Sequence, residues 1–364
     1  MNAGARQWRP WVVVVGGLLG AGKTSLILAA VNILEKTGVR SAVVINDQGE
    51  ELVDTRHVQL RGVASREVTG GCFCCRFSAL LSVMEELRAY APEVIFAEPT
   101  GSCADIAATV IRPLQDEFEL CRVAPLTVLL DPTRRNLLIA GEADPNLVFL
   151  MRKQLEEADL VCISKADRNP GAAGIPSIDA RLISAKTGAG VHEWLDEVLA
   201  GSLEAGSRTL EIDYERYAYA EAALAWLNVS FTVVLVSPAA PASVVGPFLD
   251  DLDNALTEAG VSIVHLKLID RSPAGWLKLA ICANGEEPTI DGSLDASPAH
   301  RHELLLNLRA IGSPSLVQGI AEGEIGCIDG KVLDLRINCF SPAPPIPERR
   351  RVKMRRPSGS HDAV

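Results

Sequence analysis

Over the first 200 residues, short apolar runs alternate with longer stretches that carry apolar residues at helical spacing. The runs predict buried strands and the stretches predict helices. We expect strands at Val12–Val15, Ala42–Ile45, Glu93–Ala97, Leu126–Leu130, Leu160–Ile163 and Leu182–Ser184. We expect helices at Thr24–Lys36, Ala79–Tyr90, Met151–Ala158 and Val191–Leu199. This alternation is typical of an α/β domain in which helices cover both faces of a mainly parallel sheet.

A second unit follows a stretch rich in Gly, Ser and Ala. We therefore divide the chain into an α/β domain, a linker, a smaller α+β domain and a tail that is proline-rich, then basic and disordered. The expected bounds are 1–202, 203–212, 213–340 and 341–364. The second domain is expected to contain strands at Leu227–Val236, Ser262–Leu268 and Trp276–Cys282 and helices at Val244–Ala259 and His302–Ala321. This order suits a ferredoxin-like sandwich.

The composition narrows the class of protein. The 364 residues are 48% hydrophobic and 22% charged, which is typical of a globular chain with more than one domain. No apolar run reaches the roughly 18 residues of a membrane-spanning helix, so we expect no membrane contact. The net charge of −11 argues against nucleic acid as a partner. Nine cysteines without an export signal indicate a reducing, cytoplasmic compartment. The sequence leaves open whether the protein forms a homodimer.

A glycine-rich turn joins the first expected strand to the first expected helix. Residues 17–24 read Gly-Leu-Leu-Gly-Ala-Gly-Lys-Thr and match the pattern G-x-x-x-x-G-K-[ST]. The backbone N–H groups of such a loop surround phosphates, and the helix that follows adds its positive end. Lys23 would reach the β- and γ-phosphates, and the Thr24 hydroxyl would bind Mg²⁺. The expected nucleotide-binding residues are Gly17, Gly20, Ala21, Gly22, Lys23, Thr24 and Ser25.

The segment Glu98-Pro99-Thr100-Gly101 directly follows another expected strand. A carboxylate in this position can hold Mg²⁺ directly or through water, and the N–H of Gly101 can meet the γ-phosphate. We therefore expect Glu98 and Thr24 to share a magnesium ion. The alternative is an acidic residue in an ordinary turn.

Two further segments favour GTP over ATP. Residues 164–167, Ser-Lys-Ala-Asp, resemble the N-K-x-D element of P-loop GTPases, in which the aspartate binds guanine and the lysine packs over the base. Ser164 stands where that element has asparagine. Residues 184–186, Ser-Ala-Lys, resemble the element that closes over the base in the same proteins. The expected base-binding residues are Lys165, Asp167, Ser184, Ala185 and Lys186.

Three cysteines, Cys72, Cys74 and Cys75, stand within four residues, after two glycines and before an expected helix. In an extended segment Cys72 and Cys74 share a side, and Cys75 can turn in as the helix begins. Zinc suits such thiols and takes four ligands, so Glu50, a histidine or a water would complete the site; copper(I) and cobalt(II) also fit. A redox-active pair and plain buried cysteines are the alternatives. The scattered cysteines, expected to pack in the interior, are Cys103, Cys121, Cys162, Cys282, Cys327 and Cys339.

In this order the motifs resemble those of CobW-type metallochaperone GTPases, relatives of the UreG and HypB GTPases. The resemblance spans roughly residues 11–200. It rests on Gly17–Ser25, Asn46-Asp47-Gln48-Gly49-Glu50, Gly71–Cys75, Glu98–Gly101, Gln154–Asp159 and Ser164–Asp167. It implies that GTP hydrolysis is coupled to delivery of a metal to a client metalloprotein. Family members commonly read N-E-F-G-E where this chain reads Asn46–Glu50.

The hypothesis is a two-state switch in which GTP and Mg²⁺ order residues 46–55 and the loop after Glu98, and a strand through the cysteines connects the two. Lys23, Thr24, Glu98 and Asp47 are the expected catalytic residues, and Asp47 or Glu50 would contact Mg²⁺ or the transition metal. No arginine finger is evident, so we expect slow intrinsic turnover. The alternatives are a small-molecule kinase or ATPase with structural cysteines, and a zinc buffer or sensor with vestigial turnover.

Overall fold

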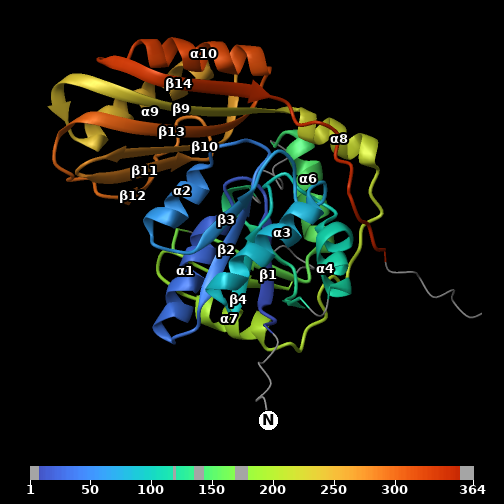
Figure 1. Ribbon diagram of the computed structural model, residues 1–364. Coiled ribbons are helices and arrows are strands. Elements are labelled where there is room, and N and C mark those ends of the chain that lie inside the picture. Colours follow the sequence, from blue (N-terminus) through green and yellow to red (C-terminus); the bar gives the residue numbers. More distant parts are fainter. Residues whose placement is uncertain (1–7, 118–119, 135–142, 169–178, 353–364) are drawn as a thin grey trace, which may run out of the picture.

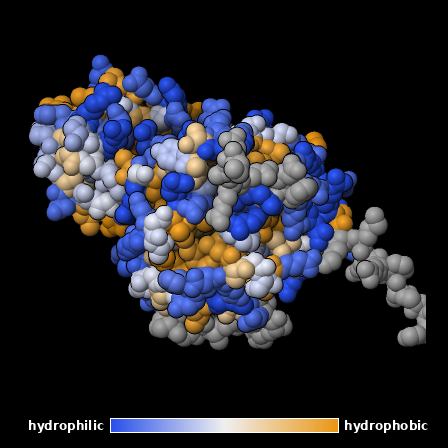
Figure 2. Space-filling view, turned by 60° about the horizontal axis from the view of Figure 1, so that its bottom comes forward, coloured by the Kyte–Doolittle hydropathy of each residue, from blue (hydrophilic) through white to orange (hydrophobic). Residues whose placement is uncertain are grey.

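The computed structural model describes residues 8–117, 120–134, 143–168 and 179–352. The chain forms two sheets, and in the view of Figure 1 the antiparallel sheet lies above the parallel one with α2 (Val53–Leu60) at their junction. Within the described part of the chain, no helix combines the length and the apolar character needed to cross a membrane. Hydrophilic residues cover most of the face shown in Figure 2, and hydrophobic residues gather in a hollow of the larger domain.

The first sheet is parallel throughout, which confirms the expected α/β class. Its strands, in spatial order, are β3 (Ser65–Val68), β2 (Ser41–Asn46), β4 (Val94–Glu98), β1 (Trp11–Gly17), β6 (Thr127–Leu130), β7 (Leu160–Ile163) and β8 (Ala180–Leu182). The short β5 (Arg122–Val123) also pairs with β1. The sequence pattern had not predicted β3.

Helices cover both faces of this sheet because alternate residues of each strand point to opposite sides. Val12 and Val14 of β1 belong to the core on one face, and Val13 and Val15 belong to the core on the other. The first face is covered by α3 (Phe77–Leu87), α4 (Arg112–Asp116), α6 (Pro145–Glu157) and α8 (Tyr214–Ala222). The second face is covered by α1 (Lys23–Lys36) and α7 (Val191–Leu199). The single turn η1 (Arg88–Tyr90) directly follows α3, and the single turn η2 (Ala107–Ile111) directly precedes α4.

The second sheet is antiparallel and has the ferredoxin-like arrangement. Its strands, in spatial order, are β12 (Thr289–Gly292), β11 (Gly275–Ile281), β10 (Ser262–Ser272), β13 (Ala299–Ile311), β9 (Leu224–Ala239) and β14 (Lys331–Phe340). Helices α9 (Pro241–Glu258) and α10 (Pro314–Gly326) connect β9 to β10 and β13 to β14. The hairpin of β11 and β12 extends the sheet beyond β10.

The expected helix at 302–321 is wrong in its first half. Residues Ala299–Ile311 form the long strand β13, and the helix begins only at Pro314, where Ser313 caps it. On β13 the buried residues alternate as a strand requires, for example His302, Leu304 and Leu306. β14 had not been predicted either.

The expectation of a disordered tail is also wrong for the part that the structure describes. After β14 the chain runs past α8 and down the side of the larger domain, where it is drawn in red in Figure 1. The Arg349 guanidinium pairs with Glu117, and Arg350 pairs with the buried Asp105. These ion pairs hold the segment because the surface below it is acidic. Residues 353–364, the rest of the expected tail, lie outside the described residues.

Candidate nucleotide and metal site

The phosphate loop has the backbone that its glycines were expected to provide. Gly17 has a φ of +130°, and a Cβ there would lie 2.6 Å from the carbonyl oxygen of Leu129. Gly22 has a φ of +92° and precedes the first residue of α1, Lys23. The Lys23 ammonium folds back over the loop and donates to the carbonyl oxygen of Gly17, 3.1 Å away. Gly20 and Ala21 lie in the loop, and the loop as a whole forms a cradle for phosphate oxygens.

Thr24 and Glu98 lie together at the mouth of this loop. The Thr24 hydroxyl donates to Glu98 Oε1 at 3.1 Å, and the Lys23 ammonium lies 3.9 Å from the same oxygen. Burial raises the pKa of Glu98. The other carboxylate oxygen, Oε2, is buried and has no hydrogen-bond partner among the described residues. An unpaired carboxylate oxygen beside a hydroxyl suits Mg²⁺, which takes oxygen ligands and keeps several waters.

Gly101 brings the loop after β4 against the phosphate loop. A Cβ at Gly101 would lie 3.0 Å from the backbone nitrogen of Leu19. Gln154 on α6 fastens the same loop, because its side-chain amide donates to the carbonyl oxygens of Gly101 and Cys103, both at 2.9 Å. Gly101 is therefore held against the phosphate loop.

The segments expected to bind the base come together after β7 and β8. The Ser184 hydroxyl donates to Asp167 Oδ1 at 2.6 Å, and this bond lowers the pKa of Asp167. Lys165 has a φ of +54°, and its ammonium pairs with Asp131 at 2.6 Å. Ala185 and Lys186 follow in the adjoining turn.

Asp47 and Glu50 are two further acidic residues expected at the site, and the charge of Asp47 acts on Lys23. Asp47 Oδ1 accepts hydrogen bonds from the N–H of Gly49 and from the guanidinium of Arg309, at 2.9 and 2.8 Å. Arg309 belongs to β13, so Asp47 joins the two sheets. Glu50 is exposed and is not part of the thiol group described next. Ser25, in the first turn of α1, is likewise exposed.

The sulfur atoms of Cys72 and Cys74 lie 2.8 Å apart, and Cys75 Sγ lies 3.3 and 3.6 Å from them. The backbone here is a turn and not the expected extended strand, because the N–H groups of Cys75 and Arg76 both donate to the carbonyl of Cys72. The turn brings consecutive thiols to one side, which an extended chain could not do.

A further thiol completes this group. Cys103 follows Gly101 by two residues, and the ligand atoms of Cys72, Cys74 and Cys103 all lie within 4.8 Å of one another. Cys103 is buried in the interior, as expected, and its thiol also lies beside those of Cys72 and Cys74. Hydrogen bonds from the thiols of Cys72 and Cys74 lower the pKa of Cys103 to about 6. Cys103 is thus the member that most readily becomes a thiolate, the form that binds metal.

Asn46, the last residue of β2, connects the two loops. Its amide nitrogen donates to the carbonyl oxygens of Val68 and Gly71, at 2.8 and 2.7 Å. Its oxygen accepts from the N–H of Phe73 at 2.7 Å and from the Thr100 hydroxyl at 2.9 Å. One buried side chain therefore binds the cysteine turn and the loop that carries Glu98 and Gly101.

The C-terminal segment covers the outer side of the cysteine turn. The N–H of Ile346 donates to Cys75 Sγ at 3.2 Å, and the N–H of Glu348 donates to the carbonyl of Cys74 at 2.9 Å. The Glu348 carboxylate accepts from the backbone and the hydroxyl of Ser78 at the start of α3. No short motif in the sequence indicates this contact.

The place of Cys103 beside the other thiols could have been predicted from the sequence, because Cys103 stands only two residues after Gly101.

Two curated proteins are similar in sequence to part of this chain. The zinc chaperone YeiR of Escherichia coli is 31% identical over 164 residues, which are 43% of this chain and 46% of YeiR. The zinc chaperone YjiA of the same organism is 37% identical over 165 residues, which are 43% of this chain and 49% of YjiA. The chain thus spans about half the length of the curated relatives it matches.

Two solved structures show weaker likeness. The zinc-bound YjiA GTPase from E. coli has a TM-score of 0.34 and 15% identity, covering 88% of this chain and 99% of that one. The nickel complex of HypB from Helicobacter pylori has a TM-score of 0.37 and 18% identity, covering 52% of this chain and 86% of that one. The model of the CobW/HypB/UreG nucleotide-binding domain matches residues 11–193, half of the chain. The chain therefore belongs to the CobW/HypB/UreG family.

Proposed function

We propose that this protein is a GTP-hydrolysing metallochaperone whose cargo is zinc. The cargo is held by the thiols of Cys72, Cys74 and Cys103, with Cys75 as the fourth sulfur in reach. Four sulfurs suit zinc, and the zinc chaperones among the relatives support that choice over nickel. The client is a metalloprotein that accepts the ion.

The observation that carries the proposal is the position of Asn46. Its side chain binds Gly71 and Phe73 at the cysteine turn and Thr100 in the loop that faces the γ-phosphate. A change at that loop on loss of the γ-phosphate therefore alters the support of the zinc ligands directly. Coupling of this kind needs only a single hydrogen-bonded residue between the two sites.

Lys23, Thr24 and Glu98 carry the nucleotide chemistry in this proposal. Lys23 binds the β- and γ-phosphates, while Thr24 and Glu98 orient Mg²⁺, which, when bound, neutralises charge on the phosphate oxygens. Asp167 binds the guanine edge with its carboxylate fixed by Ser184. Asp47, which was expected to be catalytic, forms an ion pair with Arg309 that also links it to the second sheet.

The test measures zinc affinity in three states: without nucleotide, with a non-hydrolysable GTP analogue and Mg²⁺, and with GDP. We expect a shift of about tenfold between the nucleotide states, which corresponds to about 1.4 kcal/mol of coupling. Replacing Cys72, Cys74 and Cys103 together by alanine should abolish binding. Cys339→Ala, a lone half-buried thiol on β14, is the matched control.

The other outcomes separate the alternative functions. Equal zinc affinity in all states would show a zinc buffer or sensor and refute the chaperone cycle. A strong preference for ATP, with phosphate transfer to a small molecule, would show a kinase. Absence of zinc binding would remove the cargo and leave only the nucleotide site.

A further inference from the structure

The second sheet packs directly on the phosphate loop. A Cβ at Gly20 would lie 2.5 Å from Cys282 Sγ and 3.8 Å from the His265 ring, so only glycine allows the present approach. Arg134 reinforces the contact by donating to the carbonyl oxygens of Val264 and Cys282. The start of β10 and the end of β11 therefore stand at the edge of the nucleotide site.

Lys267 lies two residues beyond His265 on β10, on the same face of the strand. Its ammonium forms an ion pair with Asp54 on α2, and only 16% of its side-chain surface is exposed. Burial acts to lower the pKa of Lys267, but the carboxylates of Asp54 and Glu98 outweigh it and raise that pKa. The side chain is therefore charged, and Glu98, the expected magnesium ligand, is close enough to affect it.

The phosphate-binding lysine brings a second positive charge to the same place. Lys23 belongs to α1, and its ammonium lies 3.9 Å from Glu98 Oε1. Lys267 belongs to β10, the strand whose His265 ring approaches Gly20 of the phosphate loop. Two ammonium groups from different domains therefore lie near the mouth of the loop and repel one another. An anion bound between them would relieve this repulsion, and a terminal phosphate is the anion that the loop is built to bind.

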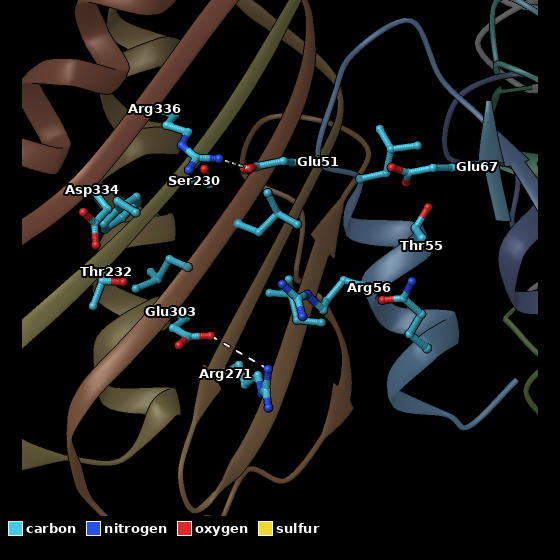
Figure 3. A pocket seen from close by; sticks show the side chains of 16 residues that line it. Glu51, Thr55, Arg56, Glu67, Ser230, Thr232, Arg271, Glu303, Asp334 and Arg336 are labelled. Carbon is cyan, nitrogen blue, oxygen red and sulfur yellow. Dashed lines mark hydrogen bonds and ion pairs between the residues drawn. The ribbon is translucent and has the colours of Figure 1, made fainter. Parts of the chain in front are cut away.

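The segment that carries Asp54 is held by the second sheet at two points. The N–H of Val53 donates to Asn307 Oδ1 at 2.8 Å, and His57 pairs with Asp291 at 2.7 Å. A cavity of about 410 Å³ separates the outer side of α2 from the open face of this sheet. Figure 3 shows Thr55 and Arg56 on α2 facing that cavity. The second sheet therefore both carries Lys267 and fixes the position of α2, the helix that carries Asp54.

On the basis of the GTPase activity proposed above, we propose that Lys267 is a cation supplied in cis to the γ-phosphate of GTP. Asp54 is its counter-ion in the present structure, and the phosphate takes the place of Asp54 as its partner when GTP binds. The second domain then has a direct role in hydrolysis, and the missing arginine finger has a substitute within the same chain.

In the reaction a water oxygen forms a bond to the γ-phosphorus, and the bond from that phosphorus to the β–γ bridging oxygen breaks. GDP leaves with the bonding electron pair, and the water protons pass to the inorganic phosphate and to solvent. Negative charge grows on the bridging oxygen and persists on the γ-oxygens during this step. The Lys267 ammonium stabilises that charge, because it is fixed in a site largely shielded from water.

The test compares single-turnover hydrolysis and nucleotide affinity for Lys267→Met and the wild-type chain. We expect hydrolysis about 100-fold slower, by analogy with loss of one fixed electrostatic donor. Affinity for a non-hydrolysable GTP analogue should fall by about tenfold, while affinity for GDP should change less than twofold. A structural effect would weaken both nucleotides together. Lys267→Arg should restore most of the rate, and Lys331→Met, at an exposed lysine on β14, should leave it unchanged.

Asp54→Asn provides the matched control, because it breaks the same ion pair but keeps the cation; it also removes the charge that faces Lys278, 3.7 Å away. If the ion pair of Lys267 with Asp54 serves only to hold the two domains together, Asp54→Asn and Lys267→Met will slow hydrolysis equally. That result would overturn the proposal. If Lys267→Met folds poorly, the double variant that combines Lys267→Met with Asp54→Asn replaces it, because it loses one charge of each sign. This double variant should hydrolyse GTP as slowly as Lys267→Met. A wild-type chain that does not hydrolyse GTP would refute the proposed function itself, whereas a fast Lys267→Met refutes only the role of Lys267.

Discussion

Replacing Asn46 by alanine tests whether the nucleotide and zinc sites communicate through one side chain. The substitution removes four hydrogen bonds, to the backbone of Val68, Gly71 and Phe73 and to the Thr100 hydroxyl. Each such bond contributes about 1 kcal/mol net, and a buried partner left alone costs about 1–3 kcal/mol. Water can enter the space vacated by the side chain and satisfy some partners. We therefore expect the free energy of unfolding to fall by about 2–4 kcal/mol.

The effect on coupling is the decisive measurement. In the wild-type chain, zinc affinity should differ by about tenfold between the GTP-analogue and GDP states; in Asn46→Ala this ratio should fall to less than twofold. Zinc titration with a competing chromophoric chelator in each state measures the ratio. The variant should still bind zinc, because all four thiols stay in place.

Asn254→Ala, at an exposed position on α9, controls for loss of an amide. It should change neither the unfolding free energy nor the affinity ratio. A tenfold ratio that survives in a folded Asn46→Ala protein would refute the reasoning, since the coupling would then have to pass by another route.

Three further predictions follow from the same structure. Burial raises the pKa of Glu157 to about 8, so wild-type stability should fall relative to Glu157→Gln by about 1.4 kcal/mol per pH unit between about pH 4.5 and about pH 8, with no further change in the difference below or above this range; urea unfolding at several pH values measures it. Deleting residues 346–364 should let a chelator extract zinc at least several-fold faster, and an unchanged rate would contradict the covering role of this segment. Gly101→Ala should weaken GTP binding by about tenfold or more, because its Cβ would press on the backbone of Leu19, whereas Gly246→Ala, in open space on α9, should not affect binding in the same calorimetric titration.

Much of the first domain follows from local signals. β7 has the bounds that its apolar run predicted, and α1 begins within one residue of the expected start. Both elements are short, regular and bounded by turn residues, so periodicity alone identifies them. The phosphate loop is equally local, because its glycines, Lys23 and Thr24 are consecutive in the chain.

The error at β13 shows where local signals fail. Residues 303–308 are rich in leucine, which favours helices, and this obscured the alternation of buried residues from His302 to Leu306. The strand forms because it lies between β10 and β9 and bonds to both. Strand preference of this kind comes from neighbours that are remote in sequence.

The sequence alone determined the α/β class, the nucleotide loop, the clustered cysteines as a candidate metal site and the family resemblance, because each depends on local patterns that can be read along the chain. Only the tertiary structure decided that Cys103 joins Cys72 and Cys74, that Asn46 connects the two loops and that Lys267 of the second sheet pairs with Asp54 on α2. The physical reason is that these groups meet where separate strands end or where one sheet packs on another. Such proximity depends on strand order and domain packing, and no spacing along the chain encodes it.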